Sequence, residues 1–397
     1  MRLAFWKKKD KTDKKKKPIW REWLDAAVFA IIAATLIRTF FFEAYTIPSG
    51  SMEGTMLIND YLFVSKVAYG PRVPMTPIAI PLVHNTIFGM KSYTEAVELK
   101  YHRLPGFGSI VRNDVVVFNG PAGDTAIEGQ GEMDYSQACR MLGRDEFFSR
   151  YKIITRPVDK KENLIKRCIG LPGDVLEVKN TRVYINGQPN VLFPHAKLNY
   201  IVRTNGQVPG VDENVEFVRA ANNSTYVYNL ANDQVEDVKH AHNVVSVEPY
   251  LSEPAGVAPV NPGEWVFPLD TVNFKWNRDN YGPLTIPKAG VTVTLTPQNI
   301  AIYRRIIRNY EGNTLDEQDG KFIINGKEAT TYTFKMDYYW MMGDNRHNSL
   351  DSRYWGFVPI DHVVGRASFV WFSYGPDGPV TDIRWRRLLH SIHALEK

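Results

Sequence analysis

Three short segments of the chain combine hydroxyl, amine, carboxylate and glycine residues at high density. The first reads YTIPSGSMEGTM at 45–56 and is followed by Asp60. The second reads LIKRCIGLPGD at 164–174, and the third reads GDNRHNSLDSRYWG at 343–356. A serine hydroxyl becomes an effective nucleophile only when a nearby base removes its proton. The segments therefore indicate nucleophilic catalysis by a serine, with the base supplied by a different segment.

Lys166 is the candidate base, because a lysine can accept a proton when its amine is kept neutral. Burial among apolar groups lowers the pKa of a lysine, since the charged form loses its solvation. The dipeptides at 164–165 and 168–169, on either side of Lys166, are Leu-Ile and Cys-Ile, so the sequence predicts an apolar setting. A serine and a lysine can act as a catalytic pair, which is a known variant of the serine protease triad.

Each segment taken alone also has an ordinary structural interpretation. Pro-Ser-Gly-Ser is a common turn composition, a lone lysine is usually solvated, and Gly-Asp-Asn-Arg can satisfy backbone groups in a turn. A serine–histidine–aspartate triad that uses His102, His347 or His362 is also possible. The three segments together favour Ser51 and Lys166 as the reactive pair.

The three segments resemble the sequence blocks of bacterial type I signal peptidases, which are membrane-bound serine proteases. The lysine block, KRxxGxPGD, is complete at 166–174, and the last block, GDNRxxSxDSR, is complete at 343–353. The serine block is present as PSGSMEGTM at 48–56, and the blocks follow the family's order. Three turn residues depart from the family pattern: Gly54 replaces proline, and Asn59 and Asn113 replace glycine. These departures leave the reactive groups in place.

The resemblance implies a role for each reactive group. Ser51 would be the nucleophile and Lys166 the general base. The Ser51 backbone N–H and the Ser49 hydroxyl would form the oxyanion hole, which stabilises the negative charge of the tetrahedral intermediate. Ser349 would orient the lysine amine through a hydrogen bond. The supporting ion pair would be Asp351 with Arg353.

The resemblance also implies the substrate, which would be the signal peptides of exported preproteins with small residues before the cut. Small residues require shallow apolar pockets. Seven residues occupy positions that could line such pockets: Tyr45, Ile47, Pro48, Met52, Met56, Leu164 and Ile165. His347 falls at a variable position of its block, so we expect it to be a spectator. No cofactor or metal is expected.

The residues before the serine block predict a membrane-spanning helix. Residues 26–37 carry no charge, and Trp20–Phe42 would be about 34 Å long as a helix, which crosses a hydrocarbon core of about 30 Å. Residues 1–17 contain eight lysines and carry a net charge of +7, so the N-terminus is expected to stay in the cytoplasm. The predicted location is the bacterial inner membrane, in a single pass, with the body on the periplasmic side. A cleaved signal peptide and a buried soluble helix also fit this segment.

The rest of the chain is expected to be mainly β, because short β-branched and aromatic runs are separated by Gly, Pro and Asn. Two Asn-Gly dipeptides, at 186–187 and 325–326, predict tight hairpins. The resemblance implies a folded-over β-sheet body with a second inserted lobe. The expected organisation is a basic cytoplasmic tail at 1–19, an anchor at 20–42, a catalytic β domain at 43–189 and 336–380, an inserted lobe at 190–335, and an amphipathic segment at 381–397. That last segment would lie on the membrane or form a terminal helix packed on the body.

The overall composition restricts the class of protein further. The chain has 397 residues, 44% of them hydrophobic and 23% charged, which is typical of a globular protein. Cys139 and Cys168 are its only cysteines and neither forms a CxxC motif, so a cysteine zinc site is excluded, while one disulfide or two buried thiols remain open. Beyond residue 17 the net charge is −2, which argues against a nucleic-acid-binding body. The expected partners are preproteins and the lipid bilayer.

Two rival classes of protein share part of this pattern with signal peptidases. A membrane-anchored β domain that binds partners without catalysis is disfavoured by the intact Ser51 and Lys166. A soluble serine–lysine autoprotease related to repressor cleavage is disfavoured by the apolar segment at 26–37. The short segment between the predicted helix and Ser51 supports an enzyme that acts close to the membrane, because the eight residues between Phe42 and Ser51 span at most about 29 Å.

Overall fold

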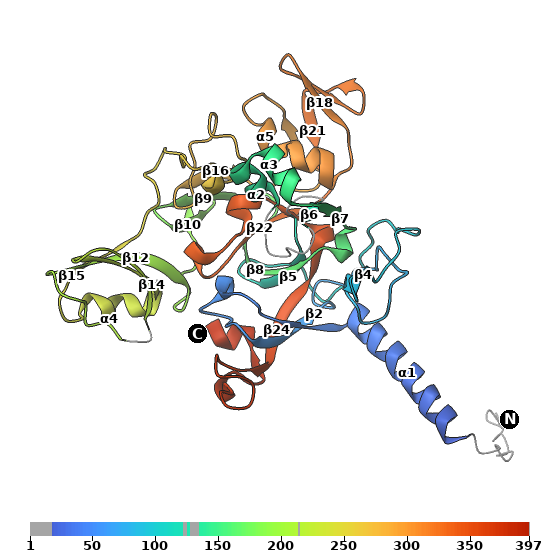
Figure 1. The fold of residues 1–397 in the computed structure, drawn as a ribbon. Coiled ribbons are helices and arrows are strands. Elements are labelled where there is room, and N and C mark those ends of the chain that lie inside the picture. The colour runs from blue at the N-terminus through green and yellow to red at the C-terminus, as the bar shows by residue number, and fades with distance from the viewer. Residues whose placement is uncertain (1–17, 122–124, 128–134, 213–214, 397) are drawn as a thin grey trace, which may run out of the picture.

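The structure is a computed structural model that describes residues 18–121, 125–127, 135–212 and 215–396. Most of the predicted basic tail, residues 1–17, lies outside the described residues. The body is mainly β, as predicted, and its strands form a curved central sheet with smaller sheets around it (Figure 1). The two cysteines are not paired: Cys168 is buried and Cys139 is half-buried.

Helix α1 spans Ile19–Phe40 and extends away from the body (Figure 1). None of its residues is buried, although the helix is apolar on every side apart from its ends. Its 22 residues are about 33 Å long, which is enough to cross a bilayer. The helix ends two residues earlier than predicted, because Phe42 already pairs with Ser65 in the first strand of the sheet.

The central sheet brings together strands that are far apart in the sequence. Its order is β1-β2-β24-β5-β8-β22-β23, and neighbouring strands run antiparallel. The bounds are Phe42–Thr46 (β1), Asp60–Ser65 (β2), Val115–Asn119 (β5), Asn163–Gly170 (β8), Tyr338–Met342 (β22), Val358–Pro359 (β23) and Val363–Ser373 (β24). Strand β24, from near the C-terminus, lies between β2 and β5, so the two N-terminal strands join the rest of the sheet only through β24.

Strand β5 is buried along its whole length because the sheet has a hydrophobic core on each face. Val115 and Val117 belong to the core that also contains Ile47, Met52 and Leu62. The alternate residues of the strand point to the opposite core, which contains Tyr69, Trp355 and Val358 among others. Both faces of the strand that supports the site are therefore packed.

A second sheet, β11-β10-β9-β16, extends the body, with strands Gln188–Pro189, Arg182–Ile185, Val175–Lys179 and Tyr281–Thr285. The three-stranded sheet β18-β19-β20 comprises Leu315–Gln318, Lys321–Ile324 and Lys327–Glu328. Both predicted Asn-Gly hairpins are confirmed, since Ile185 pairs with Gln188 and Ile324 pairs with Lys327. Further elements are β3 (Thr86–Ile87), β4 (Met90–Lys91), β6 (Thr125–Ile127), β7 (Ile153–Thr155), α2 (Tyr135–Leu142), α3 (Arg144–Arg150), β17 (Thr292–Thr294), β21 (Thr331–Thr333), α5 (Ile300–Arg305) and α6 (Ser352–Trp355).

The region 190–335, predicted as one inserted lobe, is built from two parts. A four-stranded sheet with the short helix α4 has its own core around Val202, Leu230 and Val238 (Figure 1). Its elements are β12 (Lys197–Thr204), β13 (Glu216–Asn222), β14 (Thr225–Ala231), α4 (Val235–Lys239) and β15 (Val244–Pro249). From Val266 onward the chain returns to the body and shares a core with Trp340 of the central sheet.

The C-terminal segment 381–397 differs from the amphipathic helix that its apolar spacing predicted. It forms the short turns η8 (Trp385–Arg387) and η9 (Ile392–Glu396), separated by strand β25 (His390–Ser391), which pairs with β24. Ile392 is buried in the core, and the Arg387 guanidinium donates to Asp60 Oδ2 over 2.5 Å. The segment is tied to the body by these contacts, so its apolar residues do not form one continuous exposed face.

Candidate active site

Ser51 lies in the single-turn helix η1 (Gly50–Met52), directly after β1. The turn is fixed from the opposite side, because the Asn345 backbone N–H donates to the Ser51 carbonyl over 3.2 Å. Ser51 is half-buried, whereas Ser49 precedes the turn in extended conformation and is exposed. The first N–H groups of a helical turn have no acceptor within the turn, so the Ser51 N–H is oriented for an external acceptor.

Lys166, on β8, contacts the Ser51 side chain. Its Nζ lies 2.7 Å from Ser51 Oγ and donates to the Ile165 carbonyl over 3.0 Å. The two residues are 115 positions apart in the sequence and meet because β1 and β8 belong to one curved sheet. The structure thus brings the predicted nucleophile and base to hydrogen-bond distance.

The surroundings of Lys166 explain why its amine can be neutral. Val116 lies opposite Lys166 on β5, while Leu164 and Cys168 flank it on the same face of β8. Met341 pairs with Cys168 from β22 and completes the apolar wall. Burial lowers the pKa of Lys166 to about 8, because desolvation outweighs the opposing charges of two nearby aspartates.

Ser349 does not make the predicted hydrogen bond to Lys166. Its Oγ is buried and, among the described residues, makes no hydrogen bond of good geometry, although it interacts with the Asp351 carboxylate and helps to lower the pKa of that group. The hydroxyl lies against Gly343, where a Cβ would be 2.2 Å from Ser349 Oγ and 2.5 Å from the Ser51 carbonyl oxygen. The lysine amine, which was expected to bond to the Ser349 hydroxyl, donates to the Ile165 carbonyl instead. Only glycine fits at position 343, between the two serines.

The pair Asp351–Arg353 is formed as predicted, in a fully buried setting. Arg353 donates through Nε and Nη2 to the two carboxylate oxygens of Asp351, over 2.9 and 2.8 Å. Asp351 also accepts from the Gly343 backbone N–H over 3.1 Å. Burial raises the pKa of Asp351, but the Arg353 charge outweighs this effect and keeps the pKa below its ordinary value. The carboxylate is therefore engaged by Arg353 rather than by the lysine amine.

A second buried ion pair was not predicted, although its residues adjoin those that were. Arg167 donates to both carboxylate oxygens of Asp344, over 2.8 and 2.6 Å, and to Thr55 Oγ1 over 2.9 Å. The Glu396 carboxylate, from the C-terminal segment, accepts from the same guanidinium over 2.5 Å. The pair connects the serine block, the lysine block and the last block. Thr55, Arg167 and Asp344 each lie in a different block, and this was the signal that could have revealed the contact.

The three departures from the family pattern have a conformational explanation. Asn59 and Asn113 have φ values of 66° and 72°, in the left-handed region that glycine prefers and asparagine tolerates. Gly54 has a φ of 107°, which proline cannot adopt. A Cβ at Gly54 would also lie 1.9 Å from the carbonyl oxygen of His195. The substitutions thus match the turns in which they occur.

The seven residues predicted to line the substrate pocket lie in different environments. Three of them are core residues with no more than 2% exposure: Ile47, Met52 and Met56. They pack in the core around Leu62 and Val64, behind the turn that carries Ser51. Contrary to the prediction, their side chains are therefore not exposed to a substrate. Leu164 lies on the same face of β8 as Lys166, whereas Ile165 lies on the other face. Pro48 is exposed, and Tyr45 lines a separate cavity near α1.

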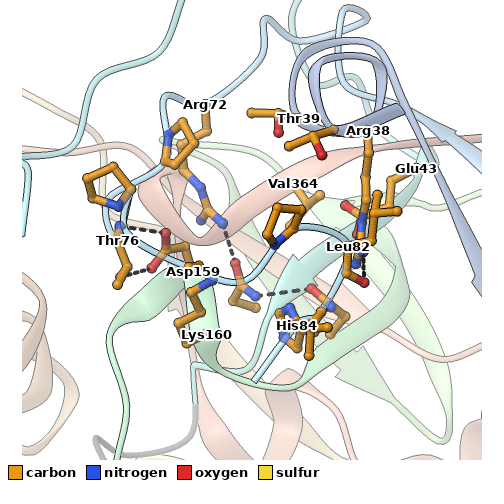
Figure 2. A pocket seen from close by; sticks show the side chains of 18 of the residues that line it. Arg38, Thr39, Glu43, Arg72, Thr76, Leu82, His84, Asp159, Lys160 and Val364 are labelled. Atoms are coloured by element: carbon orange, nitrogen blue, oxygen red, sulfur yellow. Dashed lines mark hydrogen bonds and ion pairs between the residues drawn. The ribbon is translucent and has the colours of Figure 1, made fainter. Parts of the chain in front are cut away.

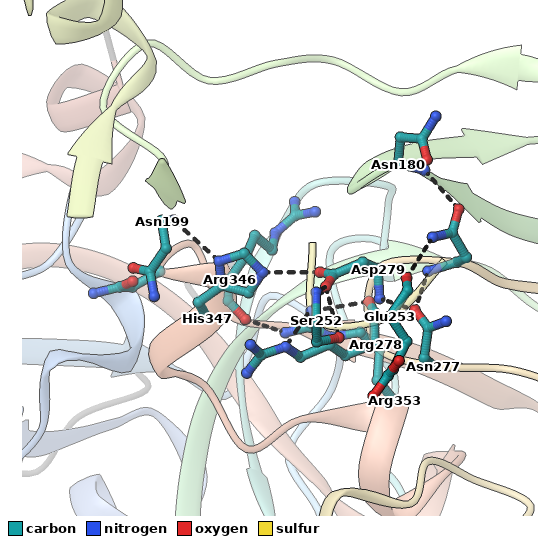
Figure 3. Close-up of polar contacts among 12 residues, drawn as sticks. Asn180, Asn199, Ser252, Glu253, Asn277, Arg278, Asp279, Arg346, His347 and Arg353 are labelled. Atoms are coloured by element: carbon teal, nitrogen blue, oxygen red, sulfur yellow. Dashed lines mark hydrogen bonds and ion pairs between the residues drawn. The ribbon is translucent and has the colours of Figure 1, made fainter. Parts of the chain in front are cut away.

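Of the three histidines considered for a triad, two are bonded to other residues and the third is exposed. His347 accepts from the Asn199 backbone N–H at Nδ1 over 3.0 Å, and its Nε2 donates to Asp279 over 2.8 Å (Figure 3). The ring therefore joins strand β12 to the loop that carries Asp279. His362 is bonded to Asp361, and His102 is exposed. A histidine-based triad has no support in this geometry.

Comparison with known proteins supports the family resemblance that the three sequence blocks indicated. The family model described as "Signal peptidase, peptidase S26" matches residues 20–246 and 270–372. A signal peptidase I of Buchnera aphidicola subsp. Schizaphis graminum is 26% identical, over 85% of this chain and 70% of the relative. Those of Haemophilus influenzae and Pseudomonas aeruginosa are each 23% identical, over 88% and 93% of this chain and 68% and 78% of the relatives.

These matches cover most of the chain and identify a serine-type peptidase, which is a hydrolase. The chain belongs to the signal peptidase family, peptidase S26.

Proposed function

We propose that this protein is a membrane-anchored serine endopeptidase that removes signal peptides from exported preproteins, with Ser51 as nucleophile and Lys166 as general base. The relatives are named signal peptidase I, and the chain carries their blocks. The observation that carries the proposal is the 2.7 Å contact between Lys166 Nζ and Ser51 Oγ in an apolar setting.

The reaction begins with the neutral amine of Lys166, which takes the proton of the Ser51 hydroxyl as Oγ attacks the scissile carbonyl carbon. The oxyanion that forms is stabilised by the Ser51 backbone N–H and the Ser49 hydroxyl. The Lys166 ammonium then gives its proton to the leaving amine, and the C–N bond breaks to leave an acyl-enzyme. Lys166 next deprotonates a water molecule, whose attack releases the signal peptide and restores Ser51.

The remaining predicted residues support this chemistry. Arg353 offsets the charge of Asp351 and so limits, without abolishing, the stabilisation of the lysine ammonium by that carboxylate. The Ser349 hydroxyl, which makes no hydrogen bond of good geometry among the described residues, is proposed to bond to the lysine amine after Ser51 has been acylated and can no longer do so. Leu164 and Pro48 are the proposed substrate contacts, and the buried methionines behind the turn limit the depth of the pocket.

Membrane anchoring is proposed from α1 and from the face of the sheet nearest to it. Tyr61 and Phe63 of β2 pack against aromatic residues of β24, with ring centroids 5.6 Å apart for Tyr61 and Trp371. Trp371 is 38% exposed. Clusters of partly exposed aromatic rings are typical of the membrane–water interface. The proposed orientation places the N-terminus in the cytoplasm and the body on the periplasmic side of the inner membrane.

The direct test is cleavage of a preprotein with Ala-x-Ala before the cut by the purified full-length chain in detergent. We expect a single cleavage after that motif, and N-terminal sequencing of the product identifies the site. A matched preprotein with bulky residues in place of both alanines should remain intact. Equal cleavage of both, or of neither, would contradict the proposal.

The dependence of the rate on pH follows from the pKa of Lys166. Only the neutral amine is a base, so kcat/KM should increase tenfold per pH unit below about pH 8 and level off above it. At pH 7 the value should lie about tenfold below the plateau. Steady-state kinetics with a fluorogenic signal peptide would measure the profile. A rate that is constant between about pH 6 and 9 would contradict the base assignment.

The orientation can be measured in sealed inner-membrane vesicles. Protease added to the periplasmic side should remove the body beyond Phe42, while an N-terminal tag should stay protected, because the lysine-rich N-terminus is retained in the cytoplasm. Detergent should make the tag accessible and serves as the control. Recovery of a mature chain that begins near residue 45 would show instead that the helix is itself cleaved.

A further inference from the structure

A cavity of about 200 Å³ lies between the last turns of α1 and the body (Figure 2). Thr35, Arg38 and Thr39 line it from one face of the helix, as their spacing of three and four residues requires. The opposite walls come from the loop after β2 and from the segment before β8. Neither Ser51 nor Lys166 lines the cavity, so it is distinct from the catalytic pair.

The cavity has an excess of positive charge. Its cationic side chains are Arg38, Lys66, Arg72 and Lys160, and its carboxylates are Glu43 and Asp159. The carboxylates are already bonded: Glu43 pairs with Lys66 at 2.8 Å and accepts from Arg38, and Asp159 accepts from Thr76. These pairings leave a net charge of +2 on the walls.

The two cations beyond the Glu43 cluster have no carboxylate bonded to them. Arg72 donates to the side-chain carbonyl of Asn119 and to the backbone carbonyl of Asp361, both over 2.6 Å. Lys160 is only 8% exposed, and its ammonium has neither a hydrogen bond nor an ion pair among the described residues. Its nearest favourable contact is the ring of Tyr93, 5.3 Å from Nζ. Burial lowers the pKa of Lys160, and the nearby charge of Asp159 opposes this effect only in part.

We propose that this cavity binds the phosphodiester headgroup of an anionic phospholipid. This inference relies on the proposed membrane anchor, because the last turn of α1 would then lie at the depth of the headgroups. Lys160 and Arg72 would hold the phosphate oxygens with charge-assisted hydrogen bonds. Ile80 and Leu82 line the same cavity and are 45% and 48% exposed, so they can contact the acyl chains. The bound lipid would fix the body relative to the membrane surface.

The experiment uses the full-length chain in detergent, incubated with phosphatidylglycerol or with phosphatidylcholine and analysed by native mass spectrometry. The wild type should retain phosphatidylglycerol in preference to phosphatidylcholine. Lys160→Met should weaken this retention about fivefold, as expected for the loss of one lysine contact to an anionic lipid. Lys100→Met removes the same charge from an exposed position on the neighbouring loop, and it should retain lipid as the wild type does.

Further measurements distinguish lipid binding from unfolding of the variant and from binding of a free anion. Lys160→Met should melt no lower than the wild type, because the substitution removes an unpaired buried charge. Equal lipid retention by Lys160→Met and Lys100→Met would overturn the proposal. Inorganic phosphate is tested alone. If phosphate bound in a Lys160-dependent way and phosphatidylglycerol did not, the cavity would be a site for a free anion, and the assignment to a lipid would be wrong. Preprotein cleavage by the wild type is assayed separately, so a failure of the proposed peptidase function is distinguishable from a failure here.

Discussion

Lys166→Met is expected to reduce preprotein cleavage by at least about 10⁴-fold, because the substitution removes the only base at hydrogen-bond distance from Ser51 Oγ among the described residues. Ser51→Ala should cause a loss of similar size. Since the two residues act on one proton, the double variant should be no less active than either single variant. Lys166→Arg should also be inactive, because a guanidinium remains protonated at any working pH.

Stability measurements distinguish this catalytic effect from unfolding. Methionine has an apolar side chain of similar length, so Lys166→Met should melt at the same temperature as the wild type or above it. The matched control is Lys275→Met, an exposed lysine between β15 and β16, which should keep full turnover. Near-normal cleavage by Lys166→Arg would show that Lys166 is not the general base.

Arg167→Met is expected to lower the free energy of unfolding by about 3–5 kcal/mol. The guanidinium is fully buried, and its loss removes the ion-pair partner of the buried Asp344 carboxylate, which then has only the more distant charge of Arg346. It also removes the cation that stacks on Phe193, 3.9 Å from the ring centroid. Urea denaturation monitored by tryptophan fluorescence would measure the change.

The double variant Arg167→Met with Asp344→Leu tests the reason for this loss. Removing both charges leaves no unpaired ion at the position of Asp344, and only the partly exposed Glu396, which also contacts His393, loses a partner, so the double variant should be more stable than Arg167→Met alone. Arg182→Met, at an exposed position of β10, should change stability by no more than about 0.5 kcal/mol. A loss below about 1 kcal/mol for Arg167→Met would show that the buried pair is not needed to hold the three blocks together.

The sequence was sufficient to select Ser51 and Lys166 as candidates and to predict α1, since each depends on a local pattern. Ser51 and Lys166 lie in dense polar blocks, and the apolar run 26–37 lacks charge throughout. Their proximity could not be deduced from these patterns, because it depends on β24 passing between β2 and β5. That arrangement is decided by long-range pairing, which leaves no local signature.

Side-chain partnerships were the less predictable part of the site. Ser349 was expected to contact Lys166, but in the structure the Ser349 hydroxyl packs against Gly343 and makes no hydrogen bond to the amine. The helical spacing of apolar residues at the C-terminus was misleading, because Arg387 and Glu396 form ion pairs with the body. The apolar character of Ile47 and Met52 was recognised, yet whether such residues face a substrate or a core depends on the fold around them.

The glycine at position 54 bears on how the enzyme could change over generations. A proline there would need a negative φ and would collide with the carbonyl of His195, at the start of the inserted segment. With that segment packed against the turn, a proline at position 54 would disrupt the conformation that holds the neighbouring Ser51. The residues that position 54 tolerates are therefore set by the inserted segment, and a substitution there would have to be accompanied by a change in the path of the chain near His195.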